Sequence, residues 1–186
     1  MNNTNAVEIA IITGVVTILV AVLTFVLNHY SSKRKKSLEL KIQYIERQME
    51  LLYGPLFSLL AQLCSLRDVK DKIDKKYINK KDELNRIDAF FNRNYFTPIH
   101  ERIKEIISSN LYLINENKIP NSFLAYLRHV SQDKAQRELY ERERIETSHI
   151  KGEMFPYSFK ENIENNMKVL KQELSELRES LGKKII

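Results

Sequence analysis

Two hydrophobic patterns follow one another in the first 66 residues of the chain. From Ile9 to Leu27 the side chains are apolar except for three threonines, and these 19 residues would form a helix of about 29 Å, close to the ~30 Å hydrocarbon core of a bilayer. From Leu38 to Leu66 apolar residues recur at alternating steps of four and three, which is the heptad pattern of a seam between helices. The sequence therefore predicts a transmembrane helix at residues 9–28 and a long helix over residues 33–75.

Gly54-Pro55 lies inside the heptad seam. Pro55 has no N–H for the carbonyl group of Leu51 and crowds that turn, so a kink is expected. Because the seam keeps its phase across the pair, the pattern predicts one long helix kinked at Gly54 and Pro55, not two separate helices. Counted back in sevens, the same register continues into the apolar run.

The rest of the chain alternates helical patterns with turn signals. An amphipathic helix is expected at residues 82–94, and Thr97-Pro98 has the hydroxyl cap and early proline that begin a new helix. Further helices are expected from Asn121 to about residue 147 and from residue 158 to residue 181. No window alternates apolar and polar residues as a strand does. The predicted fold is all-α: an N-terminal transmembrane helix, a long kinked helix, and a bundle of about four helices.

The charges of the chain predict its orientation in a membrane. Lysine and arginine number 30 against 24 aspartate and glutamate, a net charge of +6, and Lys33, Arg34, Lys35 and Lys36 stand directly after the apolar run. A signal peptide has its basic residues before the apolar run, whereas basic residues after a span mark its cytoplasmic side. We expect a short external N-terminus (1–8), a basic juxtamembrane segment (29–36) and a cytosolic bundle (37–186) at the inner, cytoplasmic membrane. The remaining charge is nearly balanced, which argues against a nucleic-acid partner.

Small residues form a stripe along the apolar run. They recur at steps of three and four: Ala10, Thr13, Gly14, Thr17, Ala21 and Thr24. Small side chains let helices approach closely in lipid, so the stripe predicts a helix contact and a homo-oligomer. The alternative is a chance pattern, because alanine, glycine and threonine are common in membrane spans.

Several landmarks together resemble a group of bacterial helical proteins with an N-terminal membrane span. The landmarks are Leu52-Tyr53-Gly54-Pro55-Leu56, then Phe96-Thr97-Pro98-Ile99-His100, then Pro120 followed by His129, and finally Phe155-Pro156. The resemblance covers residues 50–180 and departs from the group at His100, where asparagine is expected. The resemblance implies the all-α fold, but it implies no activity, because none is established for the group.

One helical face carries candidate binding chemistry. Tyr126, His129 and Asp133 share that face, as expected for an imidazole oriented by a carboxylate in a ligand-binding or general-base role. The alternative is a polar rim, or a buried hydrogen-bonded pair that fixes helix packing. No metal-ligand spacing accompanies these residues, so we predict neither a metal nor a cofactor. The single cysteine, Cys64, lies in an apolar stretch that favours a core position.

An enzymatic alternative comes from arginine–histidine pairs, which are similar to the signature of HEPN ribonucleases. The pairs are Arg93 with His100, and Arg142 or Arg144 with His149. The resemblance implies RNA cleavage by Arg93, His100, Arg144 and His149. Against it, Pro98 lies within the first pair, and the others end in a loop expected around Gly152.

The first interpretation is a membrane-anchored cytosolic binding or effector module. Its expected partners are the lipid bilayer, further copies of the chain, and an unidentified protein or small ligand. A membrane-acting component of bacterial defence or signalling is one concrete version, based on architecture alone. A membrane-tethered HEPN-like ribonuclease is the alternative.

Overall fold

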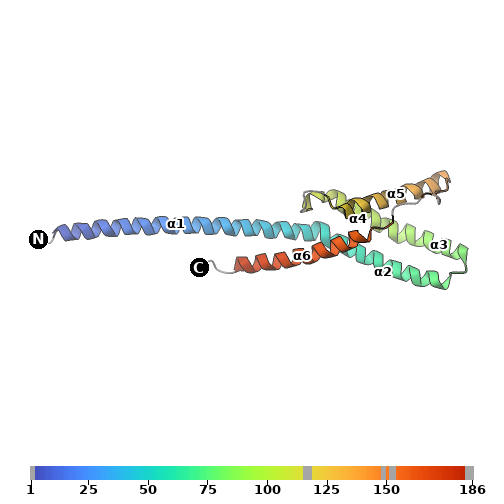
Figure 1. The fold of residues 1–186 in the computed structure, drawn as a ribbon, viewed down its shortest axis with the longest axis horizontal. Coiled ribbons are helices and arrows are strands. Elements are labelled where there is room, and N and C mark those ends of the chain that lie inside the picture. The colour runs from blue at the N-terminus through green and yellow to red at the C-terminus, as the bar shows by residue number, and fades with distance from the viewer. Residues whose placement is uncertain (1–2, 115–118, 148–149, 151–153, 183–186) are drawn as a thin grey trace. The chain divides into compact units, whose positions relative to one another are not determined.

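In the computed structural model, the described residues are 3–114, 119–147, 150 and 154–182, with side chains described from residue 13 onward. Their regular structure is entirely helical, so the predicted all-α class is confirmed. In chain order the elements are α1 (Asn3–Gln48), a first π-turn (Met49–Tyr53), α2 (Gly54–Lys76), α3 (Lys81–Phe91), a second π-turn (Asn92–Phe96), α4 (Thr97–Ser109), a 3₁₀ turn (Leu111–Leu113), α5 (Asn121–Glu143) and α6 (Tyr157–Gly182) (Figure 1).

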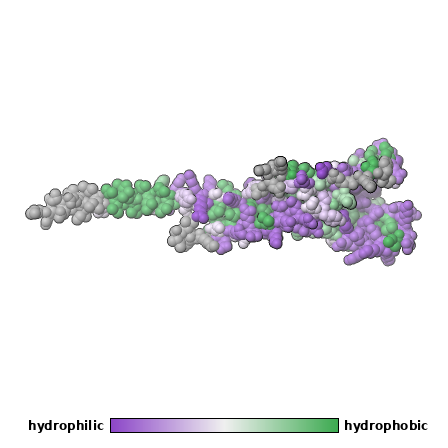
Figure 2. Space-filling view, in the orientation of Figure 1, coloured by the Kyte–Doolittle hydropathy of each residue, from purple (hydrophilic) through white to green (hydrophobic). Residues whose placement is uncertain are grey.

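The chain divides into two compact units, residues 1–44 with 174–186 and residues 45–173. The first unit contains the one helical stretch of the described residues that is long and apolar enough to cross a membrane. Its apolar side chains are exposed, from Val15 at 52% to Phe25 at 71%, and Figure 2 shows them as a continuous hydrophobic band on α1. Gly14, Thr17, Ala21 and Thr24 are exposed as well. The side chains of Ile9 and Ala10 lie outside the described residues.

The predicted long helix across Gly54-Pro55 is confirmed, and the first π-turn explains its continuity. Gly54 donates its N–H to the carbonyl of Met49, five residues back instead of four. Such a turn lengthens the hydrogen-bonded ring at the place where Pro55 has no N–H to offer. A β-carbon on Gly54 would lie 2.4 Å from the Met49 oxygen, so this position requires glycine.

The predicted helix start at Thr97-Pro98 is wrong. The helix continues from α3 through the second π-turn into α4, and Thr97 donates its N–H to the carbonyl of Asn92, again five residues back. The Thr97 hydroxyl is buried without a hydrogen-bond partner and caps nothing. Both prolines that lie inside a helix are therefore preceded by a π-turn.

The α5 helix also ends earlier than predicted, at Glu143 instead of about residue 147. Arg144 follows it with a left-handed φ of 57°, and the N–H of Ile145 bonds back to the carbonyl of Leu139 at 3.2 Å. This arrangement satisfies a carbonyl at the helix end and turns the chain away.

The core of the second unit lies where α2 packs against α3 and α4, and α4 against α5 (Figure 1). Seam residues Ile45, Leu52, Leu56 and Leu63 are buried, as the heptad pattern predicts. Farther along, Leu60 is buried at 3% exposure whereas Leu59 is half-buried. The buried stripe of α2 thus follows the 3.6-residue period of a bundle helix more closely than a strict heptad.

Candidate ligand pocket

Helices α4 and α5 bring two histidines and a tyrosine together. Nδ1 of His100 lies 2.7 Å from the hydroxyl oxygen of Tyr126, and the rings of His100 and His129 meet edge to face, with centroids 5.9 Å apart. The Tyr126 ring stacks on Phe159 of α6 at 4.3 Å, and both side chains are fully buried. Packing of α6 therefore fixes the tyrosine that orients His100.

Burial sets the charge state of this group. Burial of His100, reinforced by His129, Arg137 and Arg67 and opposed by Asp133, lowers its pKa from 6.5 to about 4. Burial raises the pKa of Tyr126 far above its ordinary value of 10.0. At neutral pH both side chains are uncharged and act as hydrogen-bonding groups.

His100 and His129 line an open hollow of about 380 Å³, which we call the histidine pocket. Its size falls within the range of small-molecule sites. The other lining residues come from α2, α3, the second π-turn and α5: Leu63, Arg67, Lys70, Asp71, Asp88, Asn92, Phe96, Asp133 and Arg137.

Most of the charged groups in the pocket are paired. Lys70 contacts Asp74 at 2.5 Å and Asp88 at 2.6 Å. Burial acts to lower the pKa of Lys70, but these two carboxylates raise it overall. Arg137 forms an ion pair with Asp133 on the same helix.

Arg67 differs from the other basic residues of the pocket. Its guanidinium carbon lies 5.6 Å from the centroid of the Phe155 ring, and Arg67 forms no ion pair with any described residue. An arginine held over an aromatic ring is positioned without losing its charge. The pocket therefore contains one basic side chain, Arg67, that forms no ion pair with any described residue.

Sequence reasoning found part of this site. His129 and Asp133 line the pocket as their shared helical face suggested, and Tyr126 lies behind it in the core. The sequence placed His100 in a different hypothesis and missed the role of Arg67. Three landmarks of the resemblance nevertheless converge here, because Phe155 contacts the rings of both His100 and His129.

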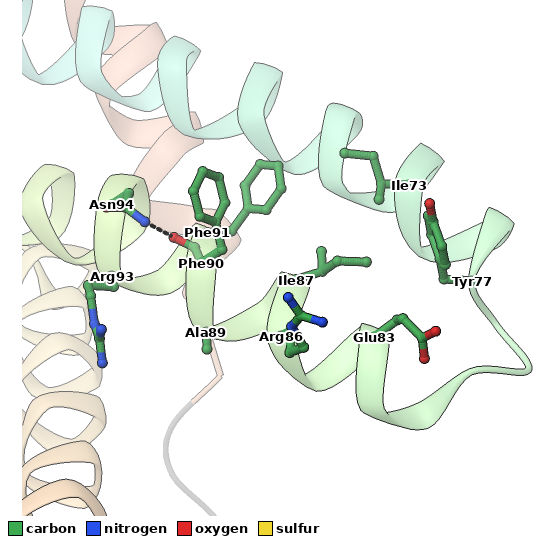
Figure 3. Close-up of a pocket in the computed structure, with 10 residues that line it drawn as sticks. All are labelled: Ile73, Tyr77, Glu83, Arg86, Ile87, Ala89, Phe90, Phe91, Arg93 and Asn94. Carbon is green, nitrogen blue, oxygen red and sulfur yellow. Dashed lines mark hydrogen bonds between the residues drawn. The ribbon is translucent and has the colours of Figure 1, made fainter.

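The residues of the ribonuclease hypothesis are dispersed. Arg93 lines a separate groove of about 750 Å³ between the end of α2 and α3, together with Tyr77 and Phe90, and extends away from Phe90 and Phe91 (Figure 3). His100 lines the histidine pocket instead. Arg144 is exposed after α5, and His149 lies outside the described residues.

Neither a metal-binding group in the described part of the chain nor a similar known protein indicates what the pocket binds. Among the described residues, no group of three or more histidine, cysteine, aspartate and glutamate side chains is arranged to hold a metal ion. A scan against protein-family models and searches of curated proteins and of solved structures found no match.

Proposed function

We propose that this protein is a single-pass membrane protein whose cytosolic helical bundle binds a small ligand in the histidine pocket. The observation that carries the proposal is the meeting of His100 and His129, from two helices, at one polar hollow, with Tyr126 hydrogen-bonded to His100 behind it. The hollow is open, and charged groups from α2, α3 and α5 line it together with the two histidines. An open hollow with a few convergent polar groups is typical of a small-ligand site.

The membrane part of the proposal is supported by exposed apolar surface. None of the described side chains in the apolar stretch of α1 is buried, and large ones such as Leu23 and Phe25 are 60% and 71% exposed. Exposed apolar surface costs about 25 cal/mol per Å² in water, and a bilayer removes that cost. The exposed basic residues 33–36 favour a cytosolic bundle.

One continuous helix supports a role in transmitting ligand binding. The helical stretch from Thr13 to Lys76 contains both the apolar residues and, near its end, Leu63, Arg67 and Lys70 of the pocket. In the proposed mechanism, a bound ligand changes the packing of α2, and oligomers formed through the Gly14 stripe respond. A membrane effector in bacterial defence or signalling is one version of this mechanism.

The membrane orientation is testable because Cys64 is the only cysteine. In a Cys64→Ser background, Thr4→Cys and Ser37→Cys place single thiols before and after the apolar run. A membrane-impermeant maleimide applied to intact spheroplasts should label the Thr4→Cys protein only, and lysis should expose both. The opposite labelling contradicts the orientation, and recovery of the protein in the soluble fraction contradicts the anchor.

Ligand binding and RNA cleavage are separated by two assays on the full chain in detergent. A small-molecule cell extract should raise the melting temperature of the wild type and leave a His129→Leu variant unchanged. No shift for the wild type argues against a ligand pocket. Cleavage of RNA that disappears in a His100→Ala variant supports the ribonuclease alternative instead.

A further inference from the structure

In the histidine pocket, one N–H group of His100 has no acceptor among the described residues. The hydroxyl of Tyr126 is buried and has Nδ1 of His100 as its hydrogen-bond partner. Because leaving a buried hydroxyl hydrogen unpaired is costly, Tyr126 donates to Nδ1. The neutral ring then carries its own proton on Nε2, for which the described chain offers no acceptor.

The pocket also contains a guanidinium group close enough to act on His100. Besides burial and His129, Arg137 and Arg67 act to lower the pKa of His100, and the carboxylate of Asp133 acts to raise it. Arg137 is paired with Asp133, so the guanidinium of Arg67 remains without a counter-ion among the described residues. A guanidinium and a nearby N–H donor form the combination that recognises carboxylate and phosphate groups.

Two further acidic residues line the pocket, Asp71 and Asp88. Asp88 is bonded to Lys70, and Asp71 lies one helical turn beyond Arg67 on α2. An anion next to His100 and Arg67 therefore meets a guanidinium that forms no ion pair with any described residue.

We propose that the histidine pocket binds the oxyanion group, a carboxylate or a phosphate, of a small ligand. Arg67 neutralises the charge of that group, and the Nε2–H of His100 donates to one of its oxygens. Tyr126 is a positioning residue that sets the proton of His100 on Nε2. The inference rests on the proposed ligand-binding function and names the class of ligand.

The test follows histidine side-chain NMR signals of the full chain in zwitterionic detergent, labelled at histidine only. The four histidines give few signals, and a His100→Asn variant identifies those of His100. Titration with inorganic phosphate and, separately, with acetate should shift the His100 signals, while chloride at equal ionic strength leaves them in place. Arg67→Gln should weaken the binding of phosphate roughly tenfold or more, and Arg67→Lys should weaken it less.

Two control variants separate a specific site from general electrostatics. Arg47→Gln removes an exposed arginine of α1 outside the pocket and should leave phosphate binding unchanged. Asp71→Asn removes a negative charge next to the site and should strengthen binding, which is the opposite of the Arg67→Gln effect. Circular dichroism shows whether each variant is folded, and the rise in affinity of Asp71→Asn remains a test if Arg67→Gln does not fold.

Further arms identify the source of the oxyanion and isolate the failure of each proposal. Shifts of His100 on transfer to nanodiscs with anionic phospholipid, without added phosphate, assign the oxyanion to a lipid headgroup. Shifts with phosphate or acetate in zwitterionic nanodiscs assign it to a soluble ligand. If the cell extract raises the melting temperature but neither anion nor anionic lipid shifts the His100 signals, the oxyanion assignment is overturned and the ligand-binding proposal stands. If the extract, the anions and the anionic lipid all have no effect, both proposals are overturned.

Discussion

The first π-turn predicts that Gly54→Ala destabilises the protein, in contrast to the usual effect of this change in a helix. In an ordinary helix interior, alanine is more favourable than glycine by about 1 kcal/mol. At Gly54 the added β-carbon would lie 2.4 Å from the carbonyl oxygen of Met49, whereas real β-carbons essentially never approach closer than 3.0 Å. The same oxygen accepts the hydrogen bond of Gly54, so it cannot move away without weakening that bond.

The expected cost follows from the neighbours of the turn. Moving the backbone of Met49 shifts Leu52 and Tyr53, which are 0% and 3% exposed. Overpacking at such a place costs about 1–3 kcal/mol, and loss of one hydrogen bond adds about 1 kcal/mol. After subtraction of the helix preference for alanine, Gly54→Ala should lower the free energy of unfolding by about 1–3 kcal/mol.

The assay is urea unfolding of the full chain in detergent, followed by circular dichroism at 222 nm. Gly182→Ala is the matched control, because a β-carbon at Gly182 meets nothing within 4 Å. This control should change the free energy of unfolding by no more than about 0.5 kcal/mol. A Gly54→Ala protein as stable as the wild type would refute the steric argument and the π-turn on which it rests.

Three other predictions test buried groups of the bundle, each by the free energy of unfolding. The pKa of His100 is about 4 in the folded protein and near 6.5 in the unfolded chain, so the free energy of unfolding of the wild type should fall by about 3 kcal/mol between pH 6.5 and pH 4. The His100→Asn variant should not show this fall. Parallel pH profiles of the two proteins would contradict the assignment of the fall to His100. Gln48 is 1% exposed and donates a hydrogen bond to the carbonyl of Leu113 at 2.6 Å, so Gln48→Met should lower the free energy of unfolding by about 1–3 kcal/mol. An unchanged free energy of unfolding would show that this hydrogen bond is dispensable. Phe159→Ala removes the ring stacked on Tyr126 and should cost about 3–5 kcal/mol, and a smaller loss indicates that the core closes around the gap.

Helical periodicity was sufficient to predict most of the elements, because a half-buried helix needs an apolar stripe of fixed period. Leu52 and Leu56 of the seam are buried, and so are Phe159, Ile163 and Leu170 on the apolar face of α6. The break expected at Thr97-Pro98 failed for a local reason. A π-turn accommodates a proline inside a helix, and its formation depends on packing that no single residue signals.

The pocket was harder to predict because its residues come from segments far apart in the chain. Tyr126 and His129 could be paired from their spacing on one helix, but His100 joins them only through the packing of α4 on α5. Arg67 gave no signal of its own, since it continues a mixed-charge stretch after the seam. Its role becomes visible only when Phe155, 88 positions later, lies beneath its guanidinium.

The requirement for glycine at position 54 changes what the Tyr-Gly-Pro sequence means for finding relatives. The restriction comes from a backbone oxygen five residues earlier, and no ligand or partner enters into it. A distant chain that keeps glycine before proline in a long helix therefore shares a steric solution and need not share a ligand. Relatives with the same activity are better sought by the residues that correspond to Arg67, His100 and Tyr126, which the backbone leaves free to vary.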